Sequence, residues 1–333
     1  MFVGALGRME MQRVPAAGYE IKGLPICGFD RKHLLKNIAV LFKIWKSQRM
    51  ANKIIRQFKP MAAVGVGGYA SGPTLNVCAK HGVPCLIQEQ NSYAGVTNKL
   101  LAKKAAKICV AYDNMERFFP AEKIIVTGNP VRQNLLENTL TPQEARTRLG
   151  LSPDKKTILI VGGSLGARTI NESVLRHLDL VEKCGAQFIW QTGKYYHADI
   201  VKALEAHREL PMLHVSDFIS DMGLAYKAAD LVISRAGASS ISEFCLIGKP
   251  VVLVPSPNVA EDHQTKNALA LVNKDAALYV KDNEAPDQLL DLAIKTVNDG
   301  AKLESLSYNI KKLGRKDSAD TIAKEVIKLA LGL

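Results

Sequence analysis

Three features that whole classes of protein depend on are scarce or absent in this sequence of 333 residues. No run of 18 uncharged apolar residues occurs, and the first residues lack the basic-then-apolar order of a secretory signal. We therefore expect no membrane-spanning segment and a cytoplasmic location. Aromatic residues make up only 6%, which leaves few side chains for stacking nucleic-acid bases. The six cysteines stand singly and outside any C-x-x-C pattern, which favours core packing over metal or disulfide roles.

The positive charge is confined to one part of the chain. The net charge is +12, and residues 1–130 hold 19 lysines and arginines against 7 acidic residues, whereas residues 131–333 hold 25 of each. An excess of this kind favours a polyanionic partner, either a nucleic acid or an anionic membrane surface. Because aromatic residues are few, the membrane is the better candidate.

Two series of short apolar runs alternate with helical patterns, the first over residues 61–130 and the second from residue 156 onwards. This alternation predicts α/β domains with parallel sheets and helices on both faces. Between the series, Thr141, Pro142 and Glu144 form a capping box that starts a short helix. We predict two doubly wound domains, residues 1–135 and 136–315, with ligands bound in a cleft.

Two turns in the second series have the pattern of anion-binding sites. VGGSLGA, residues 161–167, leads from an apolar strand into a helix, where unpaired backbone N–H groups and the helix dipole converge. An ordinary packing turn or an NAD site would also start this way, but no acidic residue closes the next strand, which disfavours NAD. SRAGASSISE, residues 234–243, offers the amides of residues 238–242, and Glu243 could accept both ribose hydroxyls. Together the turns favour a nucleoside diphosphate over a plain serine-capped helix.

The first series places two polar segments after apolar strands. These are GVGGYASGP, residues 65–73, and LIQEQNSYAGVTNKL, residues 86–100. The first segment could be a flexible connection. The four polar residues 88–91 suit a ligand rich in hydroxyl groups, because the carboxyl ends of parallel strands are where such sheets bind ligands. No D-x-D pair occurs, which argues against a sugar nucleotide held by a metal ion.

A basic, amphipathic helix is predicted over residues 34–58. Its apolar residues share one face at helical spacing and are flanked by lysines and arginines, an arrangement typical of helices that lie in a membrane interface. A core helix with solvated lysines is the alternative. The residues assigned to membrane contact are Leu34, Lys36, Ile38, Leu41, Phe42, Lys43, Trp45 and Lys46.

Seven motifs in this order resemble the MurG family of glycosyltransferases, glycosyltransferase family 28. They are GGYASGP, QEQNSYAGVTNK, GNPVR, VGGSLGARTIN, DFISDM, RAGASSISE and EDHQTKNA. The resemblance implies the GT-B fold, with two Rossmann-like domains facing a cleft and a last helix, residues 316–333, that crosses back to the first domain. It also implies transfer of N-acetylglucosamine from its UDP donor to the 4-hydroxyl of the muramyl sugar on undecaprenyl pyrophosphate. The family's reaction converts lipid I to lipid II in peptidoglycan synthesis, with inversion and without a metal or other cofactor, at the cytoplasmic face of the membrane.

The resemblance also implies which residues bind each substrate. In the donor site, Ser164 and its glycine turn would meet the phosphates, the Ile219 backbone would read uracil, and Glu243 would hold the ribose. The implied donor-binding residues are Asn91, Arg132, Gly163, Ser164, Ile219, Ala238, Ser239, Ser240, Ile241, Ser242, Glu243 and Gln264. The implied acceptor-binding residues are Gly67, Gly68, Tyr69, Ser71, Gly72 and Glu89.

One family motif is not found in this sequence. The family opens with a strand and a GGTGGH loop that supplies the histidine regarded as the base, and none of the seven histidines here stands in such a motif. We therefore assign no catalytic base and no metal ligand, and we expect this chain, lacking the first β-α unit, to be inactive or poorly folded. The alternatives are another UDP-sugar enzyme such as a soluble glycosyltransferase or an epimerase, an inactive protein that binds only donor and membrane, and an NAD oxidoreductase. A further alternative is a non-enzymatic protein that binds a membrane or a nucleic acid through its positive half and has no affinity for nucleotide sugars.

Overall fold

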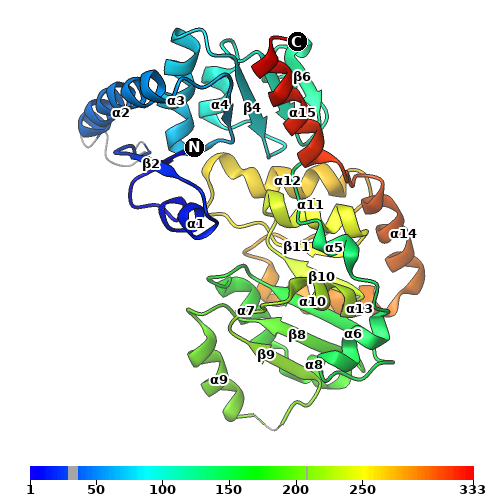
Figure 1. Cartoon of the computed structure of the whole chain (residues 1–333). Helices are drawn as coiled ribbons and strands as arrows, with labels where there is room; N and C mark the ends of the chain where they lie inside the picture. Colours follow the sequence, from blue (N-terminus) through cyan, green and yellow to red (C-terminus); the bar gives the residue numbers. More distant parts are fainter. Residues whose placement is uncertain (29–36, 208) are drawn as a thin grey trace. The chain divides into compact units, whose positions relative to one another are not determined.

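The computed structural model describes residues 1–28, 37–207 and 209–333, which form two compact units (Figure 1). Unit 1 comprises Met1–Asn129 together with Asp317–Leu333, and unit 2 comprises Pro130–Lys316. The predicted domain boundaries followed residues 135 and 315, whereas the boundaries between the two units follow residues 129 and 316. The last helix belongs to unit 1.

Unit 1 contains a parallel four-stranded sheet in the order β3-β4-β5-β6 and a separate parallel pair, β1-β2. The strands are β1 (Phe2–Ala5), β2 (Ile21–Leu24), β3 (Ala63–Gly65), β4 (Cys85–Glu89), β5 (Lys107–Val110) and β6 (Ile124–Val126). The helices are α1 (Glu10–Ala16), α2 (Asn37–Phe58), α3 (Gly68–Lys80), α4 (Val96–Leu101) and α15 (Ser318–Leu331). The βαβ rhythm predicted from residue 61 is therefore present.

Both faces of the four-stranded sheet are buried, because neighbouring residues along its strands point to opposite sides. Leu86 and Cys109 pack against Ile322 of α15 on one side. Ile87 and Ile108 belong to the larger core of unit 1 on the other side. The strands consequently read as continuous apolar runs.

Unit 2 contains a parallel six-stranded sheet in the order β12-β11-β10-β7-β8-β9 (Figure 1). Its strands are β7 (Thr157–Val161), β8 (Gln187–Gln191), β9 (Leu213–Ser216), β10 (Leu231–Ser234), β11 (Val251–Leu253) and β12 (Leu278–Tyr279). Its helices are α5 (Asn134–Glu137), α6 (Pro142–Arg148), α7 (Arg168–Arg176), α8 (Leu178–Lys183), α9 (His197–Glu205), α10 (Met222–Ala228), α11 (Ala238–Ile247), α12 (His263–Val272), α13 (Ala285–Asn298) and α14 (Gly300–Lys311). The strand order reverses between β7 and β10, and ligands of doubly wound sheets bind at such a reversal.

The core of unit 2 contains one buried polar link that leads towards this reversal. Trp190 of β8 is fully buried, and its indole Nε1 donates a 3.0 Å hydrogen bond to Asn171 Oδ1 on α7. Asn171 Nδ2 in turn donates to the carbonyl of Thr192 at 2.9 Å. These bonds fix the start of α7 against the end of β8, where the VGGSLGA turn lies.

The predicted helix starts are partly confirmed. The Thr141 side chain accepts from the Glu144 amide and the Glu144 carboxylate accepts from the Thr141 amide, so the capping box of α6 is present. The alternative interpretation of residues 65–73 as a flexible connection was wrong for most of the segment, because α3 begins at Gly68. Gly67 has φ of 86°, and this left-handed turn brings the chain into the helix at once.

Candidate functional site

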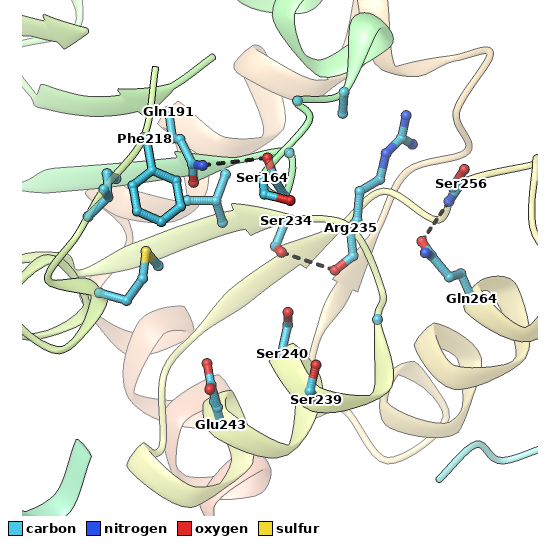
Figure 2. A pocket seen from close by; sticks show the side chains of 18 of the residues that line it. Ser164, Gln191, Phe218, Ser234, Arg235, Ser239, Ser240, Glu243, Ser256 and Gln264 are labelled. Carbon is cyan, nitrogen blue, oxygen red and sulfur yellow. Dashed lines mark hydrogen bonds between the residues drawn. The ribbon is translucent and has the colours of Figure 1, made fainter. Parts of the chain in front are cut away.

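A cavity of about 900 Å³ lies in unit 2 at the carboxyl ends of its strands (Figure 2). Segments that follow β7, β8, β9, β10 and β11 all contribute to its wall, which places it at the reversal of strand order. Of the residues assigned to the donor, eight line it: Arg132, Gly163, Ser164, Ile219, Ser239, Ser240, Glu243 and Gln264. The volume is in the range of sites that enclose a small organic ligand.

The VGGSLGA turn is held open by close backbone packing. Gly163 and Gly166 have φ of 86° and 85°, values that residues with side chains rarely adopt. A Cβ on Gly166 would clash with the carbonyl oxygen of Thr192, so the turn lies directly against the end of β8. The Gln191 side chain lines the cavity and donates to the Gly163 carbonyl at 3.5 Å. The turn therefore presents backbone rather than side chains to a ligand.

The start of α11 forms the second wall. Its N-cap is Gly237, and among the described residues no side chain caps the first amides of the helix. Figure 2 shows Ser239 and Ser240 side by side on this first turn, with Glu243 one turn further. Unpaired amides at the positive end of a helix attract anions, and phosphate groups are common occupants.

Four residues of the predicted donor set do not line the cavity: Asn91 of unit 1, and Ala238, Ile241 and Ser242 of α11. Ile241 is buried in the core, with 1% of its surface exposed. Ser242 Oγ donates back to the Ala238 carbonyl at 2.9 Å, as serine hydroxyls in helices often do. The three residues of α11 shape this helix, and the sequence could not separate them from Ser239 and Ser240 without the helix phase.

Glu243 is the buried charge of the cavity. It is 8% exposed, and its Oε1 accepts from Arg132 Nε and Nη2, both at 2.9 Å. Its Oε2 accepts from the Tyr226 hydroxyl at 3.0 Å. A buried carboxylate requires such partners, since an unpaired one would be strongly disfavoured. Burial and the neighbouring Glu243 charge raise the pKa of Tyr226, so its hydroxyl stays protonated and remains the donor.

Gln264 is oriented by two backbone amides. Its Oε1 accepts from the amides of Ala236 at 3.2 Å and Ser256 at 2.8 Å (Figure 2). The side-chain oxygen of Gln264 therefore accepts from the protein itself, and the side-chain NH₂ group is the part that can donate to a ligand.

Several lining residues were missed by the sequence analysis. Tyr226, Phe218 and Gln191 line the cavity together with Arg235 and Asp282, which form an ion pair. Arg235 also donates to the carbonyls of Val254 and Pro255, so much of its charge stabilises the loop after β11. Phe218 and Arg235 stand in the quoted motifs DFISDM and RAGASSISE, although no role was assigned to them. No local pattern marks Tyr226, Gln191 or Asp282, because these residues come together only in the folded unit.

The polar segment after β4 in unit 1 is organised around Glu89. This carboxylate is buried and accepts from the amides of Asn91 and Gly95 and from the side chains of Asn91 and Asn98. Gln88 is buried as well and donates to Asn129 Oδ1 at 2.7 Å. Glu89, predicted to bind the acceptor, and Asn91, predicted to bind the donor sugar, are thus partners that fix the loop leading into α4.

The remaining predicted acceptor residues lie at the start of α3. Gly67 and Gly68 both have positive φ, and Ser71 Oγ donates to the Gly67 carbonyl. Tyr69 is 46% exposed, with the Arg8 guanidinium 5.6 Å from its ring centroid. Gly72 lies in the second turn of the helix. Together these residues provide backbone amides at the start of a helix and one exposed aromatic ring. The Gln90 side chain donates to the Val66 carbonyl, which links the segment after β4 to the start of α3.

Helix α2 buries one face and exposes the other. Leu41, Phe42 and Trp45 are 59%, 64% and 52% exposed, whereas Ala51 and Ile55 on another face pack in the core of unit 1. Lys43 and Lys46 are exposed beside these apolar residues. Leu34, Lys36 and the side chain of Ile38, also predicted to meet the membrane, lie outside the described residues. The interpretation as a core helix therefore fits the face with Ala51 and Ile55. The exposed face with Leu41, Phe42 and Trp45 is the one to which the membrane interpretation applies.

Comparison with protein families assigns both units. Residues 157–322 match the glycosyltransferase family 28 C-terminal domain, and residues 2–110 match the glycosyltransferase family 28 N-terminal domain. The chain belongs to glycosyltransferase family 28. Its fold is GT-B, with two Rossmann-like domains, and the family that the motifs suggested is confirmed.

Curated relatives match over almost the whole chain. A protein of Phocaeicola vulgatus is 69% identical over 330 residues, which are 99% of this chain and 88% of that protein. It is named UDP-N-acetylglucosamine--N-acetylmuramyl-(pentapeptide) pyrophosphoryl-undecaprenol N-acetylglucosamine transferase. A protein of the same name from Porphyromonas gingivalis is 54% identical over 99% of this chain and 87% of its own length.

Solved structures agree on the fold. The crystal structure of Acinetobacter baumannii MurG superposes with a TM-score of 0.75 at 28% identity, covering 98% of this chain and 90% of that one. A putative UDP-N-acetylglucosamine 2-epimerase from Listeria monocytogenes superposes with a TM-score of 0.68 over 98% of this chain and 86% of that one, at 14% identity. The second similarity shows the fold alone.

In the described part of the chain, no helix is both long and apolar enough to cross a bilayer. No group of three or more histidine, cysteine or acidic side chains in that part of the chain is arranged to hold a metal ion.

Proposed function

We propose that this protein transfers N-acetylglucosamine from UDP-N-acetylglucosamine to the 4-hydroxyl of the muramyl sugar of lipid I, giving lipid II and UDP. The observation that carries the proposal is the cavity of unit 2, where two helix starts and a buried carboxylate surround one space. The names of the relatives that match 99% of the chain support the choice of both substrates.

In the proposed donor complex, the diphosphate lies against the amides of the Gly163–Ser164 turn and of Ser239 and Ser240. Glu243 accepts hydrogen bonds from the ribose hydroxyls, and Gln264 donates to the sugar. The backbone at Ile219 meets the uracil. The leaving UDP gains negative charge as its bond to the sugar breaks, and fixed amides stabilise charge that develops there.

In the proposed reaction, the acceptor oxygen forms a bond to C1 of N-acetylglucosamine while the bond from C1 to the diphosphate oxygen breaks. Attack from the opposite face inverts the configuration at C1, and the hydroxyl proton leaves to a base that we assign to no residue of this chain. The charge of the diphosphate is met by amides and arginine rather than by a metal ion. The start of α3, at Gly67–Gly72, and Glu89 at the end of β4 bind the acceptor in this proposal.

We propose that the protein acts at the cytoplasmic face of the membrane as a peripheral protein. The exposed Leu41, Phe42 and Trp45 would enter the interface, and Lys43 and Lys46 would meet anionic head groups. The excess positive charge of residues 1–130 supports this assignment, whereas a soluble UDP-sugar enzyme would need neither feature.

The test is calorimetric titration of the full chain with UDP-N-acetylglucosamine, UDP-glucose and NADH, repeated with Glu243→Gln. This variant keeps the shape of the side chain and removes the charge that Arg132 and Tyr226 now satisfy. We expect selective binding of UDP-N-acetylglucosamine, weakened about tenfold or more in the variant, since hydrogen bonds to a charged group contribute about 1.5–3 kcal/mol. Binding of NADH, or equal binding by the variant, would overturn the donor site. Transfer from radiolabelled donor to lipid I then tests the reaction itself.

A further inference from the structure

A second cavity, of about 350 Å³, lies in unit 2 and has no role in the proposed transfer. Its wall is shared with the first cavity through Tyr226, whose side chain lines both. Helices α5, α10, α11 and α14 contribute to it.

The lining combines four lysines with an apolar base. Lys227, Lys249, Lys311 and Lys316 supply the charge, and no acidic side chain of the described residues lines the cavity. In the described part of the chain, none of these lysines takes part in an ion pair. The buried Leu135 and Leu246 form much of the apolar surface. Four lysines that line one cavity, none of them in an ion pair with a described residue, would stabilise an anion placed among them.

Backbone packing holds the lysines of the α14 end in place. A Cβ on Gly314 would clash with the Cys245 carbonyl, so the segment after α14 lies directly against α11. Gly248 has φ of 66°, and Ser307 Oγ donates to its carbonyl at 2.7 Å. Gln133 Nε2 donates to the Lys316 carbonyl at 3.3 Å. The backbone that carries Lys311 and Lys316 is therefore fixed at the edge of the cavity rather than free to move with the solvent.

Lys249 is the most enclosed of the four. Its ammonium group donates to the Ala229 carbonyl, and burial lowers the pKa of Lys249 to about 8. The neighbouring Lys227 and Arg146 also lower this pKa, whereas Asp230 raises it. A bound anion would favour the charged form of Lys249, because an opposite charge within a few ångströms offsets the loss of hydration.

We propose that this cavity binds a small soluble phosphomonoester with an aliphatic part, held by Lys227, Lys249, Lys311 and Lys316 and seated on Leu135 and Leu246. Lysine binds phosphate as a point charge and needs no paired geometry, which suits ammonium groups that come from three separate segments. The aliphatic part excludes water from the apolar base. A nucleoside diphosphate fits less well, because the lining offers no aromatic face other than Tyr226 and no carboxylate for a ribose.

The shared wall couples this site to the first cavity. The Tyr226 hydroxyl donates to Glu243 Oε2, so a ligand that shifts the ring also shifts a partner of that carboxylate. Helix α10 carries Met222 in the first cavity and Lys227 in the second. Occupancy of either site therefore changes the affinity of the other by the same factor. This coupling rests on the proposed donor function, whereas binding in the second cavity does not.

The binding test uses hexyl phosphate as the probe, titrated calorimetrically into the full chain, with inorganic phosphate and hexanol as comparisons. We expect hexyl phosphate to bind at least about tenfold more tightly than either comparison, because each buried CH₂ adds about 0.8 kcal/mol. The variant Lys311→Met/Lys316→Met should weaken binding about tenfold, the sum of two partly exposed charge interactions. The matched control is Lys302→Met/Lys312→Met, which removes the same charge from exposed positions of the same region that do not line the cavity.

Three results would overturn the site. The first is an equal loss of affinity in the control variant, which would indicate attraction by net charge alone. The second is equal affinity for inorganic phosphate and hexyl phosphate. The third is no binding of hexyl phosphate by the unmodified chain. The coupling is tested by titrating UDP with and without saturating hexyl phosphate. We expect the UDP affinity to shift about fivefold, and the shift to shrink in Lys311→Met/Lys316→Met at the same probe concentration, because these two residues line the second cavity and not the first. An unshifted UDP affinity refutes the coupling, whereas absence of UDP binding counts against the proposed donor site instead.

Discussion

Replacing Arg146 by methionine should destabilise unit 2 far more than the same replacement of the exposed Arg148 on the same helix. Arg146 is buried and donates three hydrogen bonds, to the carbonyls of Ala228 at 2.9 Å and Pro153 at 2.8 Å and to Asp230 Oδ2 at 2.7 Å. Methionine preserves the apolar stem, fills most of the volume and leaves these three acceptors without their donor. The guanidinium therefore joins α6, the segment before β7 and the segment before β10.

The expected loss can be worked out from the partners that remain. Removing one member of a buried ion pair costs about 3–5 kcal/mol. Asp230 keeps the Thr157 amide at 2.7 Å and Lys156 at 3.5 Å, so the loss should lie near the lower end, about 3 kcal/mol. For a domain of this size, that corresponds to a melting temperature lower by about 6–12 °C.

Tryptophan fluorescence can follow unit 2 by itself. The chain has two tryptophans, and Trp190 is fully buried in unit 2 whereas Trp45 is half exposed in unit 1. In a Trp45→Phe background, thermal unfolding followed at Trp190 reports unit 2 within the full chain. Arg148→Met, an exposed arginine on the same helix, is the matched control and should change the melting temperature by no more than about 2 °C. A loss below about 1 kcal/mol for Arg146→Met, or one equal to that of the control, would refute the reasoning.

Three further predictions concern the turn, the titration of Lys249 and the membrane face. Gly166→Ala should abolish UDP binding and destabilise unit 2 by more than Gly185→Ala, because both positions have positive φ but only Gly166 lies against the Thr192 carbonyl; equal effects in unfolding and titration experiments would show that the close approach is unimportant. The pKa of Lys249 is lowered from 10.5 to about 8, so between these two pH values the unfolded chain binds a proton that the folded chain does not. As the pH rises from about 8 to 10.5, the stability of unit 2 should therefore increase relative to that of Lys249→Met. An equal pH dependence of both proteins would refute the burial argument. Phe42→Ser/Trp45→Ser should lose binding to anionic vesicles in a sedimentation assay while Leu100→Ser, an equally exposed apolar site of unit 1, retains it; equal binding by all three proteins would remove α2 from the interface.

Much of unit 2 was predictable because local patterns and tertiary structure agree there. Apolar strand runs alternating with helical periodicity indicated the parallel sheet, and the capping box of Thr141 and Glu144 marked the start of α6. The start of α3 was less predictable, because glycine is typical both of loops and of the left-handed residue that leads into a helix.

The candidate site divides in the same way. Gly163, Ser164, Ser239 and Glu243 stand in recognisable turns, whereas Tyr226 and Gln191 carry no local signal. Glu89 was recognised as an unusual polar residue at a strand end, but its four donors come from the loop that it organises.

The sequence by itself determined the family, the βαβ rhythm, the confinement of positive charge to residues 1–130 and the two glycine turns, because each can be seen in the order and type of residues along the chain. Only the tertiary structure decided which side chains share a space. Arg132, Tyr226 and Glu243 come together across more than 100 residues, and α10, α11 and α14 place four lysines around a second cavity. These groups of side chains form where separate helices and strands pack together, and the spacing of residues along the chain does not show which elements will do so.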